Sequence, residues 1–560
     1  MKRTISLATL IAVALLGAVS LVTAQPASAQ GSGATGSAPD IIFSNGKIIT
    51  VDERFSIAQA LAVRGDRIVA VGSDAEVGRL ATPATRRIDL RGRAVIPGLI
   101  DNHMHLLRAG TTWQWEVRLD GVGSRAAALA RLRERTKTVA AGEWIYTLGG
   151  WAIEQFADDP RPFTREELDK VVPDNPVFLQ ASYYEAYLNS RALQAMKIDD
   201  KSPDWAVRDA KGQPTGRLTE AGFRGLVARL PAAAPAAVEG STLAMIKDLN
   251  RAGLTAFGVA GCDDDLIGTY RQWAAEDKLN VRAYCIDGVG VGNSAEQVER
   301  ALPRIAAIKL FQGNNYVDHI FYGESVYGPL HDPMFIRASN PRPEQLALWR
   351  KIATEIARAG LPLHVHANLT NTIDGFLDQI EAINKEYPVK NLRWVLAHAN
   401  QLNATHLARM RELGIYAAVH PWAVINGGIN QRVFGDAALD MAPLDTIQKS
   451  GVLWGFGSDG SRANQILPFT TLWWAVTGKM VGGTKVLRQP ISREDALIAH
   501  TRRNAFLVFQ ENNLGSIQPG RLADLVVLDR DYLTVPADQI KDITPLLTMV
   551  GGRIVYEAKP

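Results

Sequence analysis

Between about residue 95 and residue 500, short apolar runs alternate with segments of helical periodicity. Helical patterns at 343–360 and 403–414 each end at a glycine, which is a common helix stop. Strands that alternate with helices form parallel sheets, and eight of them fit a (β/α)8 barrel. We therefore predict an α/β fold with a TIM barrel over residues 95–505. Its eight strands are expected in VIPGLIDNHMH, LTAFGVAG, VRAYCID, IAAIKLFQG, LPLHVHA, LRWVLAHA, IYAAVHP and LWGFGSD.

One connection of this barrel is oversized. About 140 residues separate the first apolar run from the second, and the stretch contains the strand-like pieces WIYTLGGW and PVFLQAS. Loops of that length usually carry function. We predict an insert over residues 110–240 that forms a lid or a substrate wall.

The two ends of the chain resemble each other. Residues 40–72 are short apolar runs broken by Asn45-Gly46 and Gly65-Asp66, both hairpin-turn signals. Residues 523–531 and 548–556 repeat this pattern near the C-terminus. We predict one composite β-sandwich, with its first part at 30–94 and its second at 506–560. The alternative is two unrelated hairpins.

The N-terminus has the pattern of a targeting segment. Lys2 and Arg3 precede an apolar run at 7–22, and Ala27-Ser28-Ala29 forms a small-residue cleavage site. We predict a signal peptide at 1–29 and a secreted or periplasmic protein that is free of the membrane after cleavage. A membrane anchor is the alternative, but the run is short for a span.

Composition limits the partners. The 61 Lys and Arg residues nearly balance the 58 Asp and Glu residues, so nucleic acid is not an expected partner, and a small-molecule substrate is. A homo-oligomer is left open. Oxidation outside the cytoplasm would join Cys262 to Cys285, but we expect two buried free thiols, because unpaired cysteine is among the most buried residue types.

Polar side chains fall near the ends of the predicted strands. His103 and His105 lie two apart at the end of the first run, so their imidazoles share one face, as two ligands of one metal require. His364 and His366 repeat the spacing on the fifth run. His398 ends the sixth run and Asp459 ends the eighth. Since the C-terminal strand ends of a barrel surround its active site, these residues predict a metal site there.

Lys309 lies within the predicted fourth strand. A lone lysine in an apolar strand loses solvation unless its charge is neutralised. Reaction with CO2 would convert the amine to a carbamate that bridges two metals. A substrate-carboxylate anchor and a side chain that reaches solvent remain as alternatives.

Two segments resemble the amidohydrolase superfamily, namely AVIPGLIDNHMHL (94–106) and NLGSIQPGRLADLVVLD (513–529). Within the insert, NPVFLQASYYEAYLNSRAL (175–193) and DAKGQPTGRLTEAG (209–222) resemble the family 3 branch, which includes N-substituted formamide deformylases. The resemblance implies a metal-dependent hydrolase with a composite β-sandwich and a metal-bearing barrel.

The resemblance also implies roles for single residues. One or two divalent ions, with zinc as the expected metal, would bind a set of five ligands, and Asp459 would be the catalytic proton shuttle. The implied metal ligands are His103, His105, Lys309 as its carbamate, His366 and His398. Substrate contacts are expected from Glu220, at the acidic position of the insert, and from His364, Trp151 and Tyr184, the two aromatics having core packing as their alternative.

These observations predict hydrolysis of carbon–nitrogen bonds other than peptide bonds, of the amide or N-acyl type. An esterase or lactonase, or a mononuclear deaminase, is the alternative on the same barrel. A secreted binding protein on a degenerate barrel is the alternative without catalysis. Formamide specificity is not carried over, because Gln312-Gly313, Asn368 and Tyr184-Glu185 depart from the family pattern.

Overall fold

The computed structural model describes residues 38–287 and 290–559, so the predicted signal peptide at 1–29 lies outside the described residues. Within the described part, eight strands form one parallel sheet in the order β20-β19-β18-β17-β16-β15-β14-β8. The expected α/β barrel is therefore confirmed. Its strands are β8 (Leu99–Met104), β14 (Leu254–Cys262), β15 (Arg282–Asp287), β16 (Val317–Glu324), β17 (Leu363–Ala367), β18 (Val395–His398), β19 (Tyr416–Val419) and β20 (Trp454–Phe456).

The first and last strands of this sheet meet and nearly close the barrel. The backbone N–H of Ser458 donates to Asp101 Oδ1 at 2.9 Å, and that of Asp459 donates to the His103 carbonyl at 2.9 Å. A side chain at Gly457 would put its Cβ 2.5 Å from Asn102 Oδ1, so only glycine permits this approach. The contact brings Asp459 beside His103.

Helices cover the outside of the barrel, as expected at 343–360 and 403–414. Trp349 on α10 stacks on Phe376 of α11 with ring centroids 4.4 Å apart, and α12 ends at Gly414, which has a φ of +69°. These helices are α2 (Leu106–Gly110), α7 (Pro235–Arg251), α8 (Asp264–Ala275), α9 (Ala295–Ala307), α10 (Pro343–Arg358), α11 (Thr370–Asn384), α12 (Ala404–Leu413), α13 (Ala423–Phe434), α14 (Leu444–Ser450), α15 (Pro468–Thr477), α16 (Arg493–Ala499) and α17 (Arg502–Leu507), with short 3-10 turns η3 (Gly328–Leu330) and η4 (Gly435–Asp440).

The expected fourth strand, IAAIKLFQG, is wrong. Its first residues are the end of helix α9, which starts at an N-cap where the Ser294 side chain accepts from the Gln297 N–H at 3.2 Å. Val298, Ala301 and Ile305 are buried at spacings of three and four residues, which is a helical stripe. The fourth barrel strand is β16, which begins at Val317.

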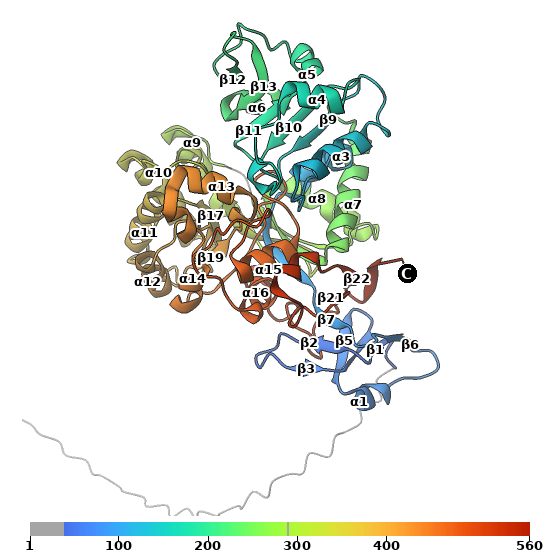
Figure 1. Ribbon diagram of the computed structural model, residues 1–560. Helices are drawn as coiled ribbons and strands as arrows, with labels where there is room; N and C mark the ends of the chain where they lie inside the picture. Colours follow the sequence, from blue (N-terminus) through green and yellow to red (C-terminus); the bar gives the residue numbers. More distant parts are fainter. Residues whose placement is uncertain (1–37, 288–289, 560) are drawn as a thin grey trace, which may run out of the picture. The chain divides into compact units, whose positions relative to one another are not determined.

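The two chain ends share one sheet, as expected for a composite β-sandwich (Figure 1). Strand β21 pairs antiparallel with β7, with Val526 opposite Ile96. A six-stranded sheet (β23-β22-β21-β7-β2-β3) and a four-stranded sheet (β5-β4-β1-β6) are found among the described residues. Their elements are β1 (Ile41–Ser44), β2 (Lys47–Ile49), β3 (Ile57–Ala58), β4 (Ala60–Arg64), β5 (Arg67–Gly72), β6 (Arg86–Asp89), β7 (Ala94–Pro97), β21 (Leu525–Leu528), β22 (Pro545–Val550) and β23 (Arg553–Glu557), with α1 (Asp74–Gly78) and η5 (Ala537–Asp542).

The insert after β8 forms its own mixed sheet in the order β12-β13-β11-β10-β9. Trp151 is fully buried in the apolar core of this insert and stacks on Phe156 at 5.8 Å. Trp151 therefore packs inside the insert, and its expected contact with substrate is wrong. The elements are η1 (Trp113–Trp115), α3 (Arg125–Arg135), β9 (Ile145–Leu148), η2 (Ile153–Gln155), α4 (Arg165–Val171), β10 (Val177–Ala181), β11 (Glu185–Leu188), α5 (Ser190–Ala195), β12 (Ala206–Arg208), β13 (Pro214–Thr219) and α6 (Glu220–Val227).

Cys262 and Cys285 form a disulfide, so the expectation of two free thiols is wrong. They lie on the neighbouring parallel strands β14 and β15, with Cα atoms 5.5 Å apart, which is within the range that a disulfide spans. In the part of the chain that the structure describes, none of the helices has the length and apolar character needed to cross a bilayer.

A buried ion pair joins the barrel to the sandwich. Arg282 of β15 donates to both carboxylate oxygens of Asp524 at 2.9 and 2.8 Å, and both side chains are almost fully buried. Asp524→Asn is expected to lower the free energy of unfolding by about 3–5 kcal/mol, because it leaves the Arg282 charge buried and unbalanced. Urea denaturation measures this loss. As a control, Asp277→Asn removes the exposed Arg553–Asp277 pair between the same two modules and should leave the urea midpoint nearly unchanged. Equal effects would contradict the prediction.

Candidate metal centre

The first group of potential ligands lies where β8 meets β20. His103 and His105, two residues apart at the end of β8, direct their Nε2 atoms to Asp459, at 3.9 and 3.1 Å from Oδ1. The three ligand atoms lie within 4.8 Å of one another. The shared strand face predicted for the two imidazoles is therefore present.

The second group lies on the next side of the barrel mouth. His366 is the next-to-last residue of β17 and His398 the last of β18, and both face Glu324 at the end of β16. His398 Nε2 is 3.0 Å from Glu324 Oε1, and His366 Nδ1 is 3.4 Å from the same oxygen. These three ligand atoms also lie within 4.8 Å of one another.

Glu324 connects the two groups. Its other oxygen, Oε2, is 3.5 Å from His103 Nε2 and 3.6 Å from His105 Nε2. The preceding Gly323 has a φ of +145°, and a Cβ there would lie 1.7 Å from the His364 carbonyl oxygen. Glycine thus allows β16 to approach β17 closely and aim Glu324 at the barrel axis.

The donor set fits divalent metal ions. Two ligands of one tetrahedral zinc lie about 3–4 Å apart, given metal–ligand distances near 2.1 Å, and the nitrogen–oxygen separations in these groups fall in that range. His103 Nε2 is buried and makes no hydrogen bond within the described residues, which costs free energy unless an ion accepts its lone pair. The site therefore suits one ion on each side of Glu324.

Buried side chains contact these histidines on the side of the ring that faces away from Glu324. His364 Nε2 is 2.8 Å from His103 Nδ1, and Asp101 Oδ1 accepts from the His103 N–H at 3.0 Å. His420 Nδ1 lies 2.5 Å from His398 Nδ1. His364 is buried against His103 and does not line the cavity, so its expected contact with substrate is wrong. Such partners orient the ligating imidazoles.

The carboxylate and imidazole charges are set by this environment. Burial would raise the pKa of Asp459, but the hydrogen bond with His105 and the nearby charges of His398 and His103 outweigh it and lower that pKa to about 2. Burial and the His366 charge lower the pKa of His398 to about 4. At neutral pH the Asp459 carboxylate is therefore ionised and able to accept a proton, and the His398 imidazole is neutral, the state that a metal ligand requires.

Backbone conformation also distinguishes the site. His398 has a φ of +70° and Asp459 a φ of +54°. Both values lie in the left-handed region of backbone conformation, which residues other than glycine rarely adopt. His398 is the last residue of β18, and Asp459 lies in the loop just after β20. Such local strain is commonly found where a side chain must be aimed at a functional centre.

A cavity of about 460 Å³ opens onto the metal centre from the insert side. Glu220 at the start of α6 lines it, as expected for a substrate contact, together with Tyr183. Tyr184 does not line this cavity but packs edge-on against Phe335, which does, at 5.6 Å. The other lining residues are His105, Arg108, Arg224, Glu324, Ser325, His331, Asp332, Pro333, Met334, His366, His398, Trp422 and Asp459.

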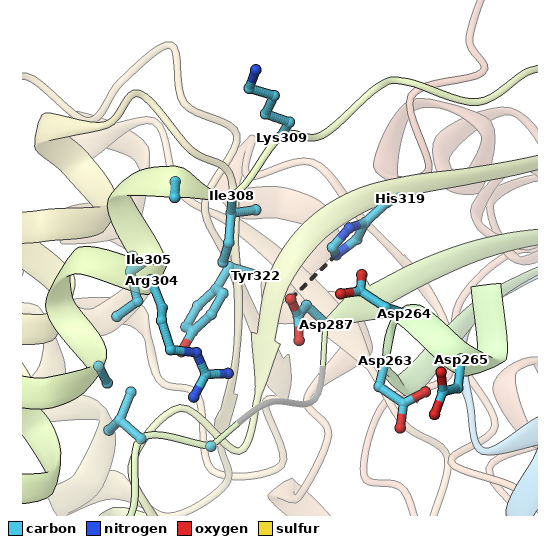
Figure 2. Close-up of a pocket in the computed structure, with 14 residues that line it drawn as sticks. Asp263, Asp264, Asp265, Asp287, Arg304, Ile305, Ile308, Lys309, His319 and Tyr322 are labelled. Carbon is cyan, nitrogen blue, oxygen red and sulfur yellow. Dashed lines mark ion pairs between the residues drawn. The ribbon is translucent and has the colours of Figure 1, made fainter. Parts of the chain in front are cut away.

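Lys309 lies elsewhere. It is exposed on the segment that follows α9, and Figure 2 shows its side chain directed away from the groups around it. It borders a separate cavity of about 680 Å³ outside the barrel wall, next to the Asp287–His319 ion pair. Lys309 is therefore not a barrel-strand residue and lies away from both ligand groups, so the expectation of a strand lysine that bridges metals is wrong; Glu324 is the residue that lies between the two histidine groups.

Several residues of the centre were missed from the sequence. Glu324 ends VDHIFYGE, a second apolar run shortly after the one chosen as the fourth strand, and this run was the available signal. His420 ends the predicted strand IYAAVHP, in the same relative position as His398. Asp332, whose Oδ1 lies 2.8 Å from His366 Nε2, comes from a loop and gave no local signal.

The fold and these groups together define a barrel hydrolase with a histidine–carboxylate metal centre. A family model described as amidohydrolase family matches residues 86–556. The chain belongs to amidohydrolase family 3. It is thus a metal-dependent hydrolase of the amidohydrolase superfamily, as the sequence resemblance implied.

Two curated relatives match over nearly their whole length. The chain is 27% identical to the N-substituted formamide deformylase of Arthrobacter pascens, over 92% of this chain and 98% of the relative. It is 26% identical to the putative amidohydrolase YtcJ of Bacillus subtilis (strain 168), over 92% of this chain and 99% of the relative.

Solved structures share the fold. An uncharacterized metal-dependent hydrolase from Pyrococcus horikoshii OT3 aligns with a TM-score of 0.61 at 20% identity, over 89% of this chain and 99% of that chain. An adenosine deaminase from Xanthomonas campestris with bound zinc aligns with a TM-score of 0.51 at 14% identity, over 92% of each chain.

Proposed function

We propose that the protein hydrolyses carbon–nitrogen bonds other than peptide bonds, with amides and N-acyl compounds as substrates and two zinc ions as cofactor. One observation carries the proposal: a single carboxylate, Glu324, faces His103 and His105 with one oxygen and His366 and His398 with the other. A bridging anion between two histidine pairs suits two cations and favours the binuclear enzyme over a mononuclear deaminase.

The residues that would hold the two ions are His103 and His105 on one side, His366 and His398 on the other, and Glu324 between them. When bound, zinc lowers the pKa of a coordinated water to about 7 and polarises the scissile carbonyl. The protein supplies the shape of the cavity and the placement of the acid–base group.

Asp459 is the proton shuttle in this proposal. Its Oδ1 lies 3.1 Å from His105 Nε2, and its Oδ2 accepts from Trp422 Nε1 at 3.0 Å, which fixes the carboxylate plane toward the cavity. Asp459 takes a proton from the attacking water and delivers it to the leaving nitrogen, so that the products are a carboxylic acid and an amine. An ionised carboxylate at neutral pH is the state that this role requires.

The disulfide supports a place of action outside the cytoplasm. Structural disulfides persist in oxidising compartments and are rare in the cytosol. The Cys262–Cys285 bond is thus in accord with the proposed signal peptide and with a secreted or periplasmic enzyme.

Metal removal tests the proposed function. The protein stripped with a chelator is expected to lose turnover of N-acyl amines, and two equivalents of zinc per chain should restore it, because the water is activated only in the loaded site. Elemental analysis measures the number of zinc ions bound per chain. Turnover of an ester and a lactone of matched structure, compared with that of the amide, shows which type of bond the enzyme prefers to hydrolyse. Full turnover by metal-free protein, or activity on esters alone, would contradict the proposal.

A further inference from the structure

Arg108 lies beside the candidate metal centre, and none of the residues that the structure describes forms an ion pair with it. Helix α2 starts directly after His105, so Arg108 is about one turn further on. Its side chain lines the cavity of about 460 Å³ described above and an adjoining cavity of about 410 Å³. Its Nε is buried, and the Arg108 side chain makes no hydrogen bond or ion pair with the residues that the structure describes. A buried N–H group without a hydrogen-bond acceptor destabilises the folded protein, unless a bound ligand accepts its hydrogen bond.

The acidic groups of the cavity are already engaged. Glu220 pairs with Arg224 at 2.6 Å. Asp332 is held by His366 at 2.8 Å, and Glu324 and Asp459 face the metal-binding histidines. Each acidic side chain that lines this cavity thus has another partner, and a ligand could supply the anion that pairs with Arg108.

We propose that Arg108 binds a carboxylate of the substrate, and that the substrates are N-acylated amino acids. The planar guanidinium fork matches a carboxylate in two parallel hydrogen bonds, and the anchor lies near the metal centre, so the carboxylate belongs close to the scissile amide. The adjoining cavity, with Leu107, Val259 and Leu266 on its walls, offers space for an apolar group. The substrate class rests on the proposed function, whereas the carboxylate site does not.

Paired substrates test the proposal. N-acetylphenylalanine and the neutral N-acetylphenethylamine differ by the carboxylate alone. The zinc-loaded enzyme is expected to show a kcat/KM ratio that favours the acid by about 10- to 100-fold, the range of a charge-assisted hydrogen-bonded pair. Arg108→Gln should reduce this ratio to near one, and Arg108→Lys should restore part of it. A ratio near one in the wild type, or an unchanged ratio in Arg108→Gln, would overturn the proposal.

Binding separates this inference from the proposed function. Titration calorimetry on the zinc-loaded Asp459→Asn full-length chain measures affinity for both compounds without turnover. Tighter binding of the acid that is lost in Arg108→Gln supports the carboxylate site even if the wild type hydrolyses neither compound, in which case the proposed function alone fails. Equal affinities overturn the carboxylate site. Lys309→Gln, an exposed cation away from this cavity, serves as the control and should bind and discriminate like its parent.

Discussion

Glu324→Gln is expected to reduce kcat/KM by more than about 100-fold. Loss of a residue that only supports a metal ligand costs up to about 100-fold, and Glu324 is proposed to be a ligand itself. Glutamine keeps the shape of the side chain but removes the negative charge that faces both histidine pairs. Two cations held close together would lose the anion between them. Elemental analysis should show at least one equivalent of metal lost per chain, and steady-state kinetics gives the loss in turnover.

Lys309→Ala is the matched control for this change. If Glu324 holds the bridging position, Lys309→Ala retains metal and activity, and intact-mass analysis finds no carbamate on the chain. The opposite pattern, with an active Glu324→Gln and an inactive Lys309→Ala, would refute the assignment of Glu324 as the bridging ligand.

Asp459→Asn is expected to lower kcat by about 10²- to 10⁴-fold, the usual contribution of a positioned acid–base group. The amide cannot accept the proton that the ionised carboxylate takes, although it keeps the hydrogen bond from Trp422. Because the substrate still enters the same cavity, KM should change much less than kcat. Steady-state kinetics gives kcat, and elemental analysis of the same sample gives its metal content. A low kcat with full metal content shows that proton transfer, and not metal binding, is lost.

Asp445→Asn provides the comparison for this variant. Asp445 is a helix residue that pairs with Lys449 at 2.8 Å and does not line the catalytic cavity. Its replacement should leave kcat unchanged. An Asp459→Asn enzyme with kcat similar to that of Asp445→Asn would exclude Asp459 as the proton shuttle.

Most of the barrel could be predicted because its signals are local. A buried strand appears as a short apolar run, and His103 with His105 reveals its shared face by spacing alone. The same holds for His366 and His398, which lie at the C-terminal ends of their strands, next to last in β17 and last in β18. The alternating order of strands and helices then gives the barrel, since few topologies are compatible with that order.

The fourth strand could not be placed in the same way. The end of α9 and the following residues form an apolar run with a lysine, and without coordinates this run cannot be distinguished from a buried strand. The departure at Gln312-Gly313 from the family pattern has the same origin, because that segment precedes β16 and is not part of it. Glu324 could be recognised as a bridge only in space, from its distances to four histidines.

The disulfide and the position of the loop residue Asp332 could not be predicted from local sequence patterns, because both depend on contacts between distant segments. Cys262 and Cys285 meet because β14 and β15 are neighbouring strands with a register shift just before Cys262, a relation that depends on the whole sheet. Asp332 reaches His366 from a loop whose path no periodicity describes.

The pairing of β7 with β21 imposes an order of events on the newly made chain. Strand β7 is completed early in synthesis, yet the strand that covers one of its edges emerges from the ribosome only near the end. Until then β7 offers an unpaired edge to other chains. A polypeptide cut short before Leu525 would keep that edge permanently open, so premature termination should yield aggregates even when the barrel and its metal ligands are all present.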